Sequence, residues 1–305
     1  MSEPTARWDN PRMDVARTDD SAMVAEFTHA RLPDLDAGII RNSTDPAAVR
    51  DLTMLVGREG ERVVAAALAC QPAGNPDSWR FVHVSTLTTH SGQGRGRQMY
   101  DALLATLADE VEELATGVAD DDPVALDVAR HWGYEVRQHT ITSQLDLEGA
   151  RFPEPAAGVS LEACDTLAFD DEAEVEAMLL ASQTNPEAEL GLLNTIDGLR
   201  SGVGSDQRLV AALARMHGRP AAISVAIVDG DEMHVFYTGV DLALRGHDLG
   251  RLTKRFLHAH AARLGVRTAI TDNEFHNVGI RHVNEELGYV HRRGSYMMTR
   301  SRSGA

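Results

Sequence analysis

The stretch VHVSTLTTHSGQGRGRQMYDALLATL, residues 82–107, runs from a β-like segment through a glycine-rich turn into a helical pattern. A second stretch, HVFYTGVDLALRGHDLGRLTKRFLHAHAARL, residues 234–264, has the same order of strand, turn and helix. Each is followed by a short apolar run and by a helix that closes on Gly-Tyr, at positions 133–134 and 288–289. A repeat of this length indicates two copies of one domain and not a solenoid.

The two turns have the chemistry of a phosphate cradle. Glycines let the backbone adopt positive φ and approach a ligand closely. The helix that follows directs unpaired N–H groups, with roughly half a positive charge from the macrodipole, at one point. That arrangement suits a pyrophosphate. Because the pattern occurs twice in matching surroundings, we expect one such site in each copy.

These segments resemble the acyl-CoA-binding core of the GNAT superfamily of CoA-dependent N-acetyltransferases, in a tandem layout similar to that of mycothiol synthase. The family turn reads Arg/Gln-x-x-Gly-x-Gly/Ala; the corresponding residues are SGQGRG at 91–96 and RGHDLG at 245–250. Copy one lacks the leading Arg/Gln. In copy two Asp248 replaces the middle glycine and brings a carboxylate near the diphosphate.

A later family signature, an Asn followed by a helix and a Gly-aromatic pair, matches TDNEFHNVGIRHVNEELGY at 271–289. In copy one the matching stretch is VADDDPVALDVARHWGY at 118–134, where Asp122 stands in place of Asn277. The resemblance implies an α+β (layered α/β) fold of two tandem GNAT-like domains, each a mixed, mostly antiparallel sheet flanked by helices. It also implies acetyl-CoA as the acyl donor.

The domain boundaries follow from a proline- and glycine-containing stretch between the copies. We expect a tail at residues 1–13, a GNAT-like domain at 14–148 that is degenerate, a linker at 149–157 and the catalytic GNAT-like domain at 158–302. Within them, strands are predicted at 63–70, 80–86, 208–216, 221–229 and 232–240.

Composition limits the partners. With 305 residues and a net charge of −17, the chain is long enough for two domains and unsuited to nucleic acid or an anionic membrane. Cys70 and Cys164 have no paired spacing, no run of 18 apolar residues is present, and the amino terminus lacks a signal-peptide pattern. We expect a cytoplasmic monomer or homodimer without a metal site.

The catalytic prediction rests on the strand before each turn. In the family a base often lies six residues before the last core position of this strand, which gives His234 in copy two and Arg80 in copy one. Imidazole can act as a base near neutral pH, whereas a guanidinium cannot. Copy two is therefore the predicted catalytic copy, although His234 can equally be an outward-facing surface histidine. Glu232 is the reserve base.

The family's usual acid for the departing thiolate is a Tyr four residues before the closing glycine. Those positions are Asn284 and Ala129, so no acid is assigned. Asn273 and Asn277 can contact the pantetheine arm or the turn, or can cap a helix. The basic residues Arg95, Arg97, Arg251 and Lys254 fit phosphate contacts or a solvated helix face equally well. The predicted CoA-binding residues are Thr238, Gly239, Val240, Arg245, Gly246, His247, Asp248, Leu249, Gly250, Arg251, Asn273 and Asn277 in copy two, and Val84, Thr86, Gly92, Gly94, Arg95, Gly96 and Arg97 in copy one.

The acceptor is not identified by sequence. The helical region 169–199, which the family uses to roof the acceptor cleft, is acidic and suits a cationic amine, but an exposed helix face explains the charges as well. A small-molecule amine is preferred. Two functions stay open: an acetyl-CoA-dependent N-acetyltransferase that works by direct attack with general-base assistance, and a non-catalytic protein that binds or senses acyl-CoA.

Overall fold

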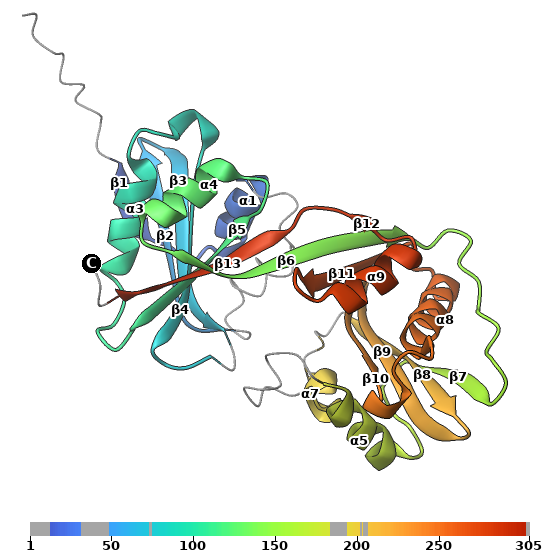
Figure 1. The fold of residues 1–305 in the computed structure, drawn as a ribbon. Helices are drawn as coiled ribbons and strands as arrows, with labels where there is room; N and C mark the ends of the chain where they lie inside the picture. Colours follow the sequence, from blue (N-terminus) through green and yellow to red (C-terminus); the bar gives the residue numbers. More distant parts are fainter. Residues whose placement is uncertain are drawn as a thin grey trace, which may run out of the picture. The chain divides into compact units, whose positions relative to one another are not determined.

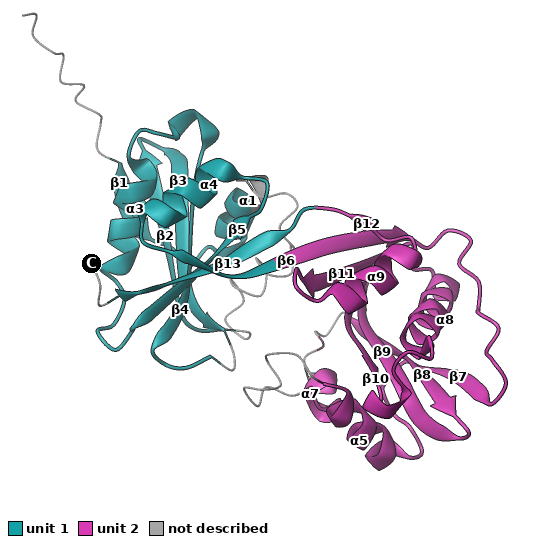
Figure 2. Ribbon diagram, in the orientation of Figure 1, with its two compact units in different colours: residues 1–139, 293–305 teal, residues 140–292 magenta. Residues whose placement is uncertain are grey.

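The computed structural model describes residues 13–31, 49–72, 75–183, 194–201, 203 and 207–302. The chain forms two compact units, residues 1–139 with 293–305 and residues 140–292, coloured teal and magenta in Figure 2. None of the helices among the described residues is long and apolar enough to cross a membrane.

Unit 1 is built on a mixed sheet (Figure 1) in the order β1-β2-β3-β4-β5-β13. Only the β4–β5 pair is parallel, and the other neighbours are antiparallel. Its elements are β1 (Asp14–Arg17), α1 (Ser21–Arg31), β2 (Val49–Glu59), β3 (Arg62–Pro72), β4 (Trp79–Thr86), η1 (Thr88–His90), α3 (Arg95–Leu104), β5 (Glu113–Ala119), α4 (Pro123–His131) and β13 (Ser295–Ser301).

Unit 2 repeats this plan with the sheet order β6-β11-β10-β9-β8-β7, and β12 also pairs with β6. Here β10–β11 is the parallel pair and the other neighbours are antiparallel. Its elements are β6 (Glu135–Asp146), which begins in unit 1, β7 (Val159–Cys164), α5 (Glu172–Ser182), α7 (Ile196–Ser201), β8 (Arg208–Met216), β9 (Arg219–Asp229), β10 (Glu232–Val240), η2 (Leu242–Leu244), α8 (Leu249–Arg263), β11 (Thr268–Glu274), α9 (Val278–Glu286) and β12 (Val290–His291).

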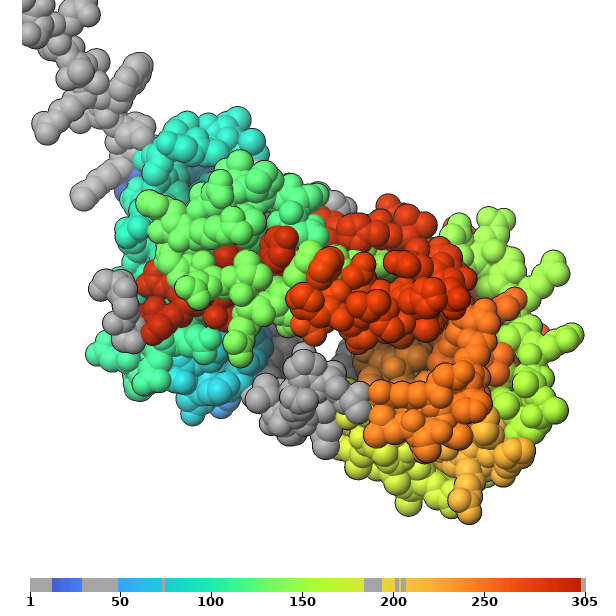
Figure 3. Space-filling view, viewed as in Figure 1, coloured from blue at the N-terminus to red at the C-terminus, as the bar shows by residue number. Residues whose placement is uncertain are grey.

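Helices cover both faces of each sheet because the central strands are apolar on both sides. In unit 2, Leu257 of α8 packs on one face against Met233 and Val235, while Leu179 of α5 packs on the other against Val225. In unit 1, α3 packs on one face of the sheet and α1 packs on the other. The space-filling view shows the α8 and α9 side of unit 2, in orange and orange-red (Figure 3). The predicted fold class, two layered α+β domains with mixed sheets, is confirmed.

The last strand of each repeat is exchanged between the units. β6 follows the first repeat in sequence, but from Thr140 it pairs with β11 of unit 2. β13 follows the second repeat, but it pairs with β5 of unit 1. The units therefore differ from the predicted domains 14–148 and 158–302, because two similar repeats offer similar edges to either closing strand. The predicted linker 149–157 has no helix or strand, and residues 1–12 of the predicted tail lie outside the described residues.

Because β13 pairs with β5, a core substitution in β13 should destabilise unit 1 and not unit 2. Met298 is fully buried in the core of unit 1 with Met99 and Leu103. Met298→Ala should lower the free energy of unfolding by about 2–5 kcal/mol and speed amide hydrogen exchange in α3 and β5. The matched control is Met297→Ala, at a partly exposed neighbour on the opposite face. Faster exchange in α8, with no acceleration in α3, would contradict the assignment of β13 to unit 1.

Candidate functional site

The parallel strands in the middle of each unit pair briefly and then part. In unit 2 the β10–β11 ladder runs from Glu232↔Thr268 to His234↔Ile270. In unit 1 the β4–β5 ladder runs from Trp79↔Glu113 to Phe81↔Ala115. Each pair stays in register for three residues, and beyond them the strands open toward the glycine-rich turn. This opening is the candidate site of each unit.

The turns have the same backbone conformation in both units. Gly92 (φ 73°) and Gly94 (φ 79°) are left-handed in unit 1, and Gly246 (φ 82°) and Asp248 (φ 60°) are left-handed in unit 2. Gly94 and Asp248 are the N-cap residues of α3 and α8. A left-handed non-glycine residue costs roughly 1 kcal/mol, though Asp tolerates it better than most. Asp248 therefore keeps the shape of the turn but adds a carboxylate to it.

The final glycine of each turn lets the helix approach the strand. A Cβ at Gly250 would lie 3.2 Å from Cγ2 of Val240, and one at Gly96 would lie 3.7 Å from Cγ2 of Thr86. Because the two contacts are equivalent, Gly96 corresponds to Gly250 and Thr86 corresponds to Val240 in the two repeats.

In unit 1 the opening is a cleft of about 590 Å³. It is lined by the second half of β4, the turn, the end of β5 and α4. Tyr100 stacks on Trp132 with ring centroids 4.2 Å apart, and its hydroxyl donates to Tyr134 across 3.1 Å. The predicted residues Val84, Thr86, Gly92, Gly94, Gly96 and Arg97 all line this cleft.

The cleft of unit 1 also holds an imidazole that the sequence count missed. β10 carries a register shift between Val235 and Tyr237, whereas the β3–β4 ladder has none. The extra residue makes Phe81, not Arg80, the unit 1 counterpart of His234, whereas His83 corresponds to Tyr237. His83 lines the cleft, its Nε2 lies 2.8 Å from Oγ of Ser85, and burial lowers its pKa to about 4. It is therefore neutral at physiological pH.

Several predicted basic residues are already engaged. The guanidinium of Arg80 contacts Asp51 at 2.5 Å, well before the opening. Arg95 is buried, pairs with Glu59 at 2.5 Å and is not part of the cleft lining, although its backbone N–H begins α3. Arg97 pairs with Asp101 on the same helix.

In unit 2 the side chains of the turn are held within the protein. Arg245 donates to the carbonyl of Ser182 at the end of α5 across 3.1 Å. Nδ1 of His247 lies 3.2 Å from the carbonyl of Leu244. Arg251 donates through Nε and Nη2 to both carboxylate oxygens of Asp248, which raises the pKa of Arg251. The carboxylate of Asp248, at the position of the middle glycine, thus neutralises the charge of Arg251.

His234, the predicted base, stands at the point where the strands of unit 2 part. Its Nε2 lies 3.0 Å from Oδ2 of Asp272 on β11. Thr142 of β6, directly opposite Asp272, donates to Oδ1 across 2.5 Å. Burial acts to raise the pKa of Asp272, but the hydrogen bonds from His234 and Thr142 outweigh it and hold that pKa below its usual value. The result is a partly buried imidazole with an ionised partner.

The other predicted residues of β10 lie on either side of His234. Glu232 is exposed at the start of the strand, in the part still paired with β11. Thr238 and Val240 lie past the bulge, and Oγ1 of Thr238 is 2.9 Å from Oγ of Ser224. Tyr237 packs in the α5 core, and its hydroxyl lies 2.5 Å from Oγ of Ser182. Gly239 is required there because a Cβ would lie 2.3 Å from the Tyr237 hydroxyl.

Comparison with known proteins identifies this arrangement. Residues 181–269 match the family model described as acetyltransferase (GNAT) domain. A tandem GNAT protein from the clavulanic acid biosynthesis pathway aligns with a TM-score of 0.70 and 20% identity, over 95% of this chain and 98% of that one. The protein has a tandem GNAT fold.

Two further solved structures resemble this chain in fold. A GCN5-related N-acetyltransferase from Sphaerobacter thermophilus aligns with a TM-score of 0.68 and 13% identity, over 95% of this chain and 96% of that one. A glucosamine N-acetyltransferase region of a fungal multi-domain β-N-acetylglucosaminidase aligns with a TM-score of 0.67 and 14% identity, over 96% of this chain and 38% of that one. Comparison with curated proteins found no significant match.

The two predicted asparagines of the GNAT signature have different roles. Asn277 is the N-cap of α9, where its side chain accepts from the backbone N–H of Ile280 across 3.4 Å, and Asp122 caps α4 in the same way. Of the alternatives left open, capping is the one observed. Asn273 instead accepts from Nδ2 of Asn284 across 2.5 Å, and Asn284 accepts from Lys254 across 2.6 Å. Lys254 is buried, so both sequence-based interpretations of it, a phosphate contact and a solvated face, were wrong.

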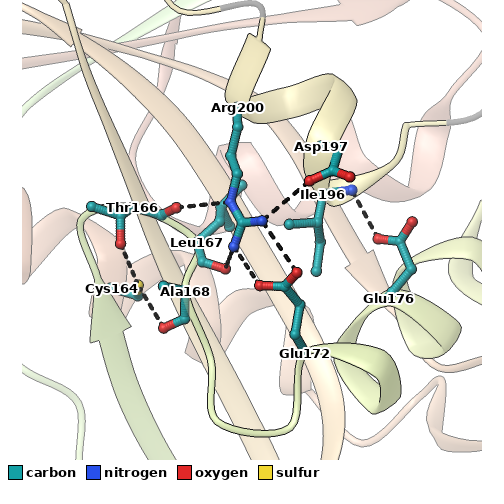
Figure 4. Close-up of polar contacts among 9 residues, drawn as sticks. All are labelled: Cys164, Thr166, Leu167, Ala168, Glu172, Glu176, Ile196, Asp197 and Arg200. Carbon is teal, nitrogen blue, oxygen red and sulfur yellow. Dashed lines mark hydrogen bonds and ion pairs between the residues drawn. The ribbon is translucent and has the colours of Figure 1, made fainter.

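In the described part of the acidic region 169–199, several carboxylates are paired within unit 2. Arg200 of α7 forms an ion pair with Glu172 of α5 and donates to the carbonyls of Thr166 and Leu167 (Figure 4). Glu176 accepts from the backbone N–H of Ile196, and Asp171 pairs with Arg215. These contacts lower the pKa of Glu172 and of Asp171. Glu187 and Glu189 lie outside the described residues.

Sequence reasoning missed the partners of the predicted base. Asp272 directly follows the segment RTAIT at 267–271, and Thr142 lies in the segment HTITSQLDL at 139–147. A carboxylate on the strand next to a histidine is a usable signal, but register places them together and local sequence does not specify register. Among the described residues, no group of His, Cys, Asp or Glu is arranged to hold a metal ion.

The Arg200 contacts should hold α7 against α5. Arg200→Met should speed amide exchange in α7 and in the segment 165–168, by an amount equivalent to about 1–2 kcal/mol, because two backbone carbonyls and a carboxylate lose a charged donor. Hydrogen exchange with mass spectrometry measures this. Arg208→Met, at an exposed arginine that begins β8, is the control. Equal exchange in both variants would show that Arg200 does not anchor α7.

Proposed function

We propose that the protein is an N-acetyltransferase that transfers an acetyl group from acetyl-CoA to the amine of a small molecule, with the reaction centre in unit 2. The observation that supports this most is the contact of His234 with Asp272 at the point where β10 and β11 part. A base held by a third group is the usual arrangement for activating a nucleophile. His234 is preferred to Glu232, which lies outside the opening.

The chemistry requires a neutral amine next to a thioester. With Nε2 next to Asp272, the imidazole of His234 has Nδ1 as its basic nitrogen, and it removes a proton from the incoming ammonium directly or through water. The amine nitrogen then attacks the carbonyl carbon, the C–S bond breaks and CoA leaves as the thiolate. Asp272 keeps the ring in the required tautomer and stabilises the imidazolium that forms.

The residues of the turn fit the diphosphate of acetyl-CoA. Left-handed positions 246 and 248 expose the backbone N–H groups that begin α8, at residues 249–251, and a Cβ built at Gly246 would meet nothing within 4 Å. In this proposal Arg245, His247, Leu249, Gly250 and Arg251 surround the diphosphate, and Thr238, Gly239, Val240 and Asn273 line the pantetheine arm. Unit 1 binds a second CoA in its cleft without catalysis, since His83 is buried and its pKa is low.

A small amine is favoured over a protein substrate because α5 and α7 cover this face of the sheet and are tied together by Arg200. Much of the acidic charge in this region is already paired. The acceptor therefore does not need to carry several positive charges.

His234→Ala should lower kcat by roughly 10²–10⁴-fold with little effect on acetyl-CoA affinity, if His234 is the base. Thiol release in the presence of a panel of amines measures the rate, and calorimetry measures affinity. The control is His276→Ala, at an exposed histidine just after β11. Tight acetyl-CoA binding without thiol release by the wild-type protein would instead favour the acyl-CoA-binding or sensing alternative.

Asp272→Asn should reduce kcat and move the acidic limb of the kcat/KM profile to lower pH. The carboxylate stabilises the imidazolium, so its loss lowers the pKa of the base, and the base then becomes protonated only at lower pH. A pH–rate profile checks the shift. If the limb stays in place while kcat falls, Asp272 does not act through His234.

Asp248→Gly should bind acetyl-CoA several-fold more tightly and stabilise the protein by about 1 kcal/mol. The glycine removes a left-handed non-glycine residue and a carboxylate near the diphosphate, and it releases Arg251. Isothermal titration and thermal unfolding measure the two effects. Asp248→Asn separates charge from conformation, because it removes the charge alone. Weaker binding by both variants would mean that the carboxylate contributes to binding.

A further inference from the structure

Lys254 is the only lysine among the 305 residues; every other basic side chain apart from histidine is an arginine. It is also among the largest fully buried side chains, with 1% of its surface exposed. Its Nζ donates to Oδ1 of Asn284 across 2.6 Å and lies 4.6 Å from the ring centroid of Tyr289. An arginine is always charged, whereas a lysine can lose its proton when buried. The one titratable side-chain amine is therefore an interior one.

The position of Lys254 in the repeat places it at the wall of the unit 2 opening. It lies six residues after the N-cap Asp248, as Tyr100 lies six residues after the N-cap Gly94. Asn284 lies four residues before the closing glycine, as Ala129 does in unit 1. Tyr100 and Ala129 both line the unit 1 cleft. Lys254 and Asn284 thus form a hydrogen-bonded pair at the positions that correspond to Tyr100 and Ala129 of unit 1. Asn284 in turn donates a hydrogen bond to Asn273 on β11.

The surroundings of Lys254 leave its charge unneutralised. Among the described residues no carboxylate forms an ion pair with it; its Nζ lies over the ring of Tyr289, and its charge acts on His258 of α8. Burial lowers the pKa of Lys254 to about 7. Burial and the Lys254 charge lower the pKa of His258 to about 3, and burial raises the pKa of Tyr289, so both stay neutral. Lys254 is the member of this cluster that exchanges a proton near neutral pH.

We propose that Lys254 is the acid that protonates the departing CoA thiolate, and that Asn284 positions its ammonium group. The inference rests on the proposed function. When the C–S bond breaks, the electron pair stays on sulfur, which takes a proton from Nζ and leaves a neutral amine. The proton that His234 removed from the incoming ammonium balances this loss through solvent, and both groups return to their starting states.

This assignment accounts for the departure at position 284. The GNAT resemblance puts a Tyr acid at that position, and the Asn side chain found there cannot supply a proton. Its amide oxygen can, however, hold a charged donor at the same wall of the opening. A lysine with a near-neutral pKa is as suitable for general-acid catalysis as a phenol whose pKa lies several units higher.

The kinetic test uses the leaving group. Lys254→Met keeps the volume and removes the proton, and Lys254→Gln retains a hydrogen bond to Asn284 without titrating. With acetyl-CoA both should lower kcat/KM by roughly 10²-fold. With phenyl thioacetate, whose thiolate needs no acid, the loss should be only a few-fold. Arg255→Met, at an exposed position on α8, is the control and should behave as wild type with both donors.

Because Lys254 is the only lysine, its own signal can be followed without turnover. In protein labelled with ¹³Cε-lysine, one side-chain resonance should titrate near pH 7. CoA should shift that resonance, and desulfo-CoA, which lacks the sulfur, should shift it much less. Equal shifts with the two ligands would place the sulfur away from Lys254 and overturn the proposal.

The remaining outcomes are also decisive. An equal loss with both thioesters means that Lys254 is structural, and unchanged rates in both variants mean that it has no role; either result leaves the proposed transferase intact. Acetylation of Lys254 itself, detected by mass spectrometry after incubation with acetyl-CoA, would make it an acceptor and not an acid. No transfer by the wild-type protein would remove the proposed function and this inference together.

Discussion

The opening between two parallel strands is the constraint on which the rest of each unit depends. β10 and β11 stay in register only as far as His234↔Ile270, and the backbone beyond that point is available to a ligand. A β-bulge in β10 immediately follows, as bulges often do beside functional sites. The glycine-rich turn then leads into α8, which begins at Leu249 directly after the N-cap Asp248. A cradle for a diphosphate and a gap for an extended arm are thereby built from one strand–turn–helix segment.

The exchanged strands are part of the site of unit 2. β6 lies beside β11 and supplies Thr142, which donates to the carboxylate that contacts His234. Asp272 is therefore held from both sides, by a strand of each repeat. Lys254 of α8, Asn284 of α9 and Asn273 of β11 are joined by two further hydrogen bonds in unit 2. Unit 1 has the same plan but lines its cleft with Tyr100, Trp132 and Tyr134, which supply apolar surface and no charge.

Much of this fold is predictable from the sequence, because local patterns determine it. The strands predicted at 208–216 and 232–240 coincide with β8 and β10, and Gly92, Gly94 and Gly246 of the turns have positive φ. What could not be predicted depends on register and on partner choice. The bulge adds one residue to β10, so counting residues back from the turn does not give the true counterpart of His234 in β4. The exchange of β6 and β13 depends on which of two similar sheets each strand joins. The exchange of β6 places Thr142 opposite Asp272, and the register of β10 and β11 brings Asp272 to His234.

A crystal structure of the protein with acetyl-CoA tests the central claim most directly. The account predicts a thioester in unit 2 between β10 and β11, with its diphosphate at residues 245–251 and its carbonyl carbon on the side of His234. A ligand bound only in the unit 1 cleft, or one in unit 2 whose thioester points away from His234, would contradict it.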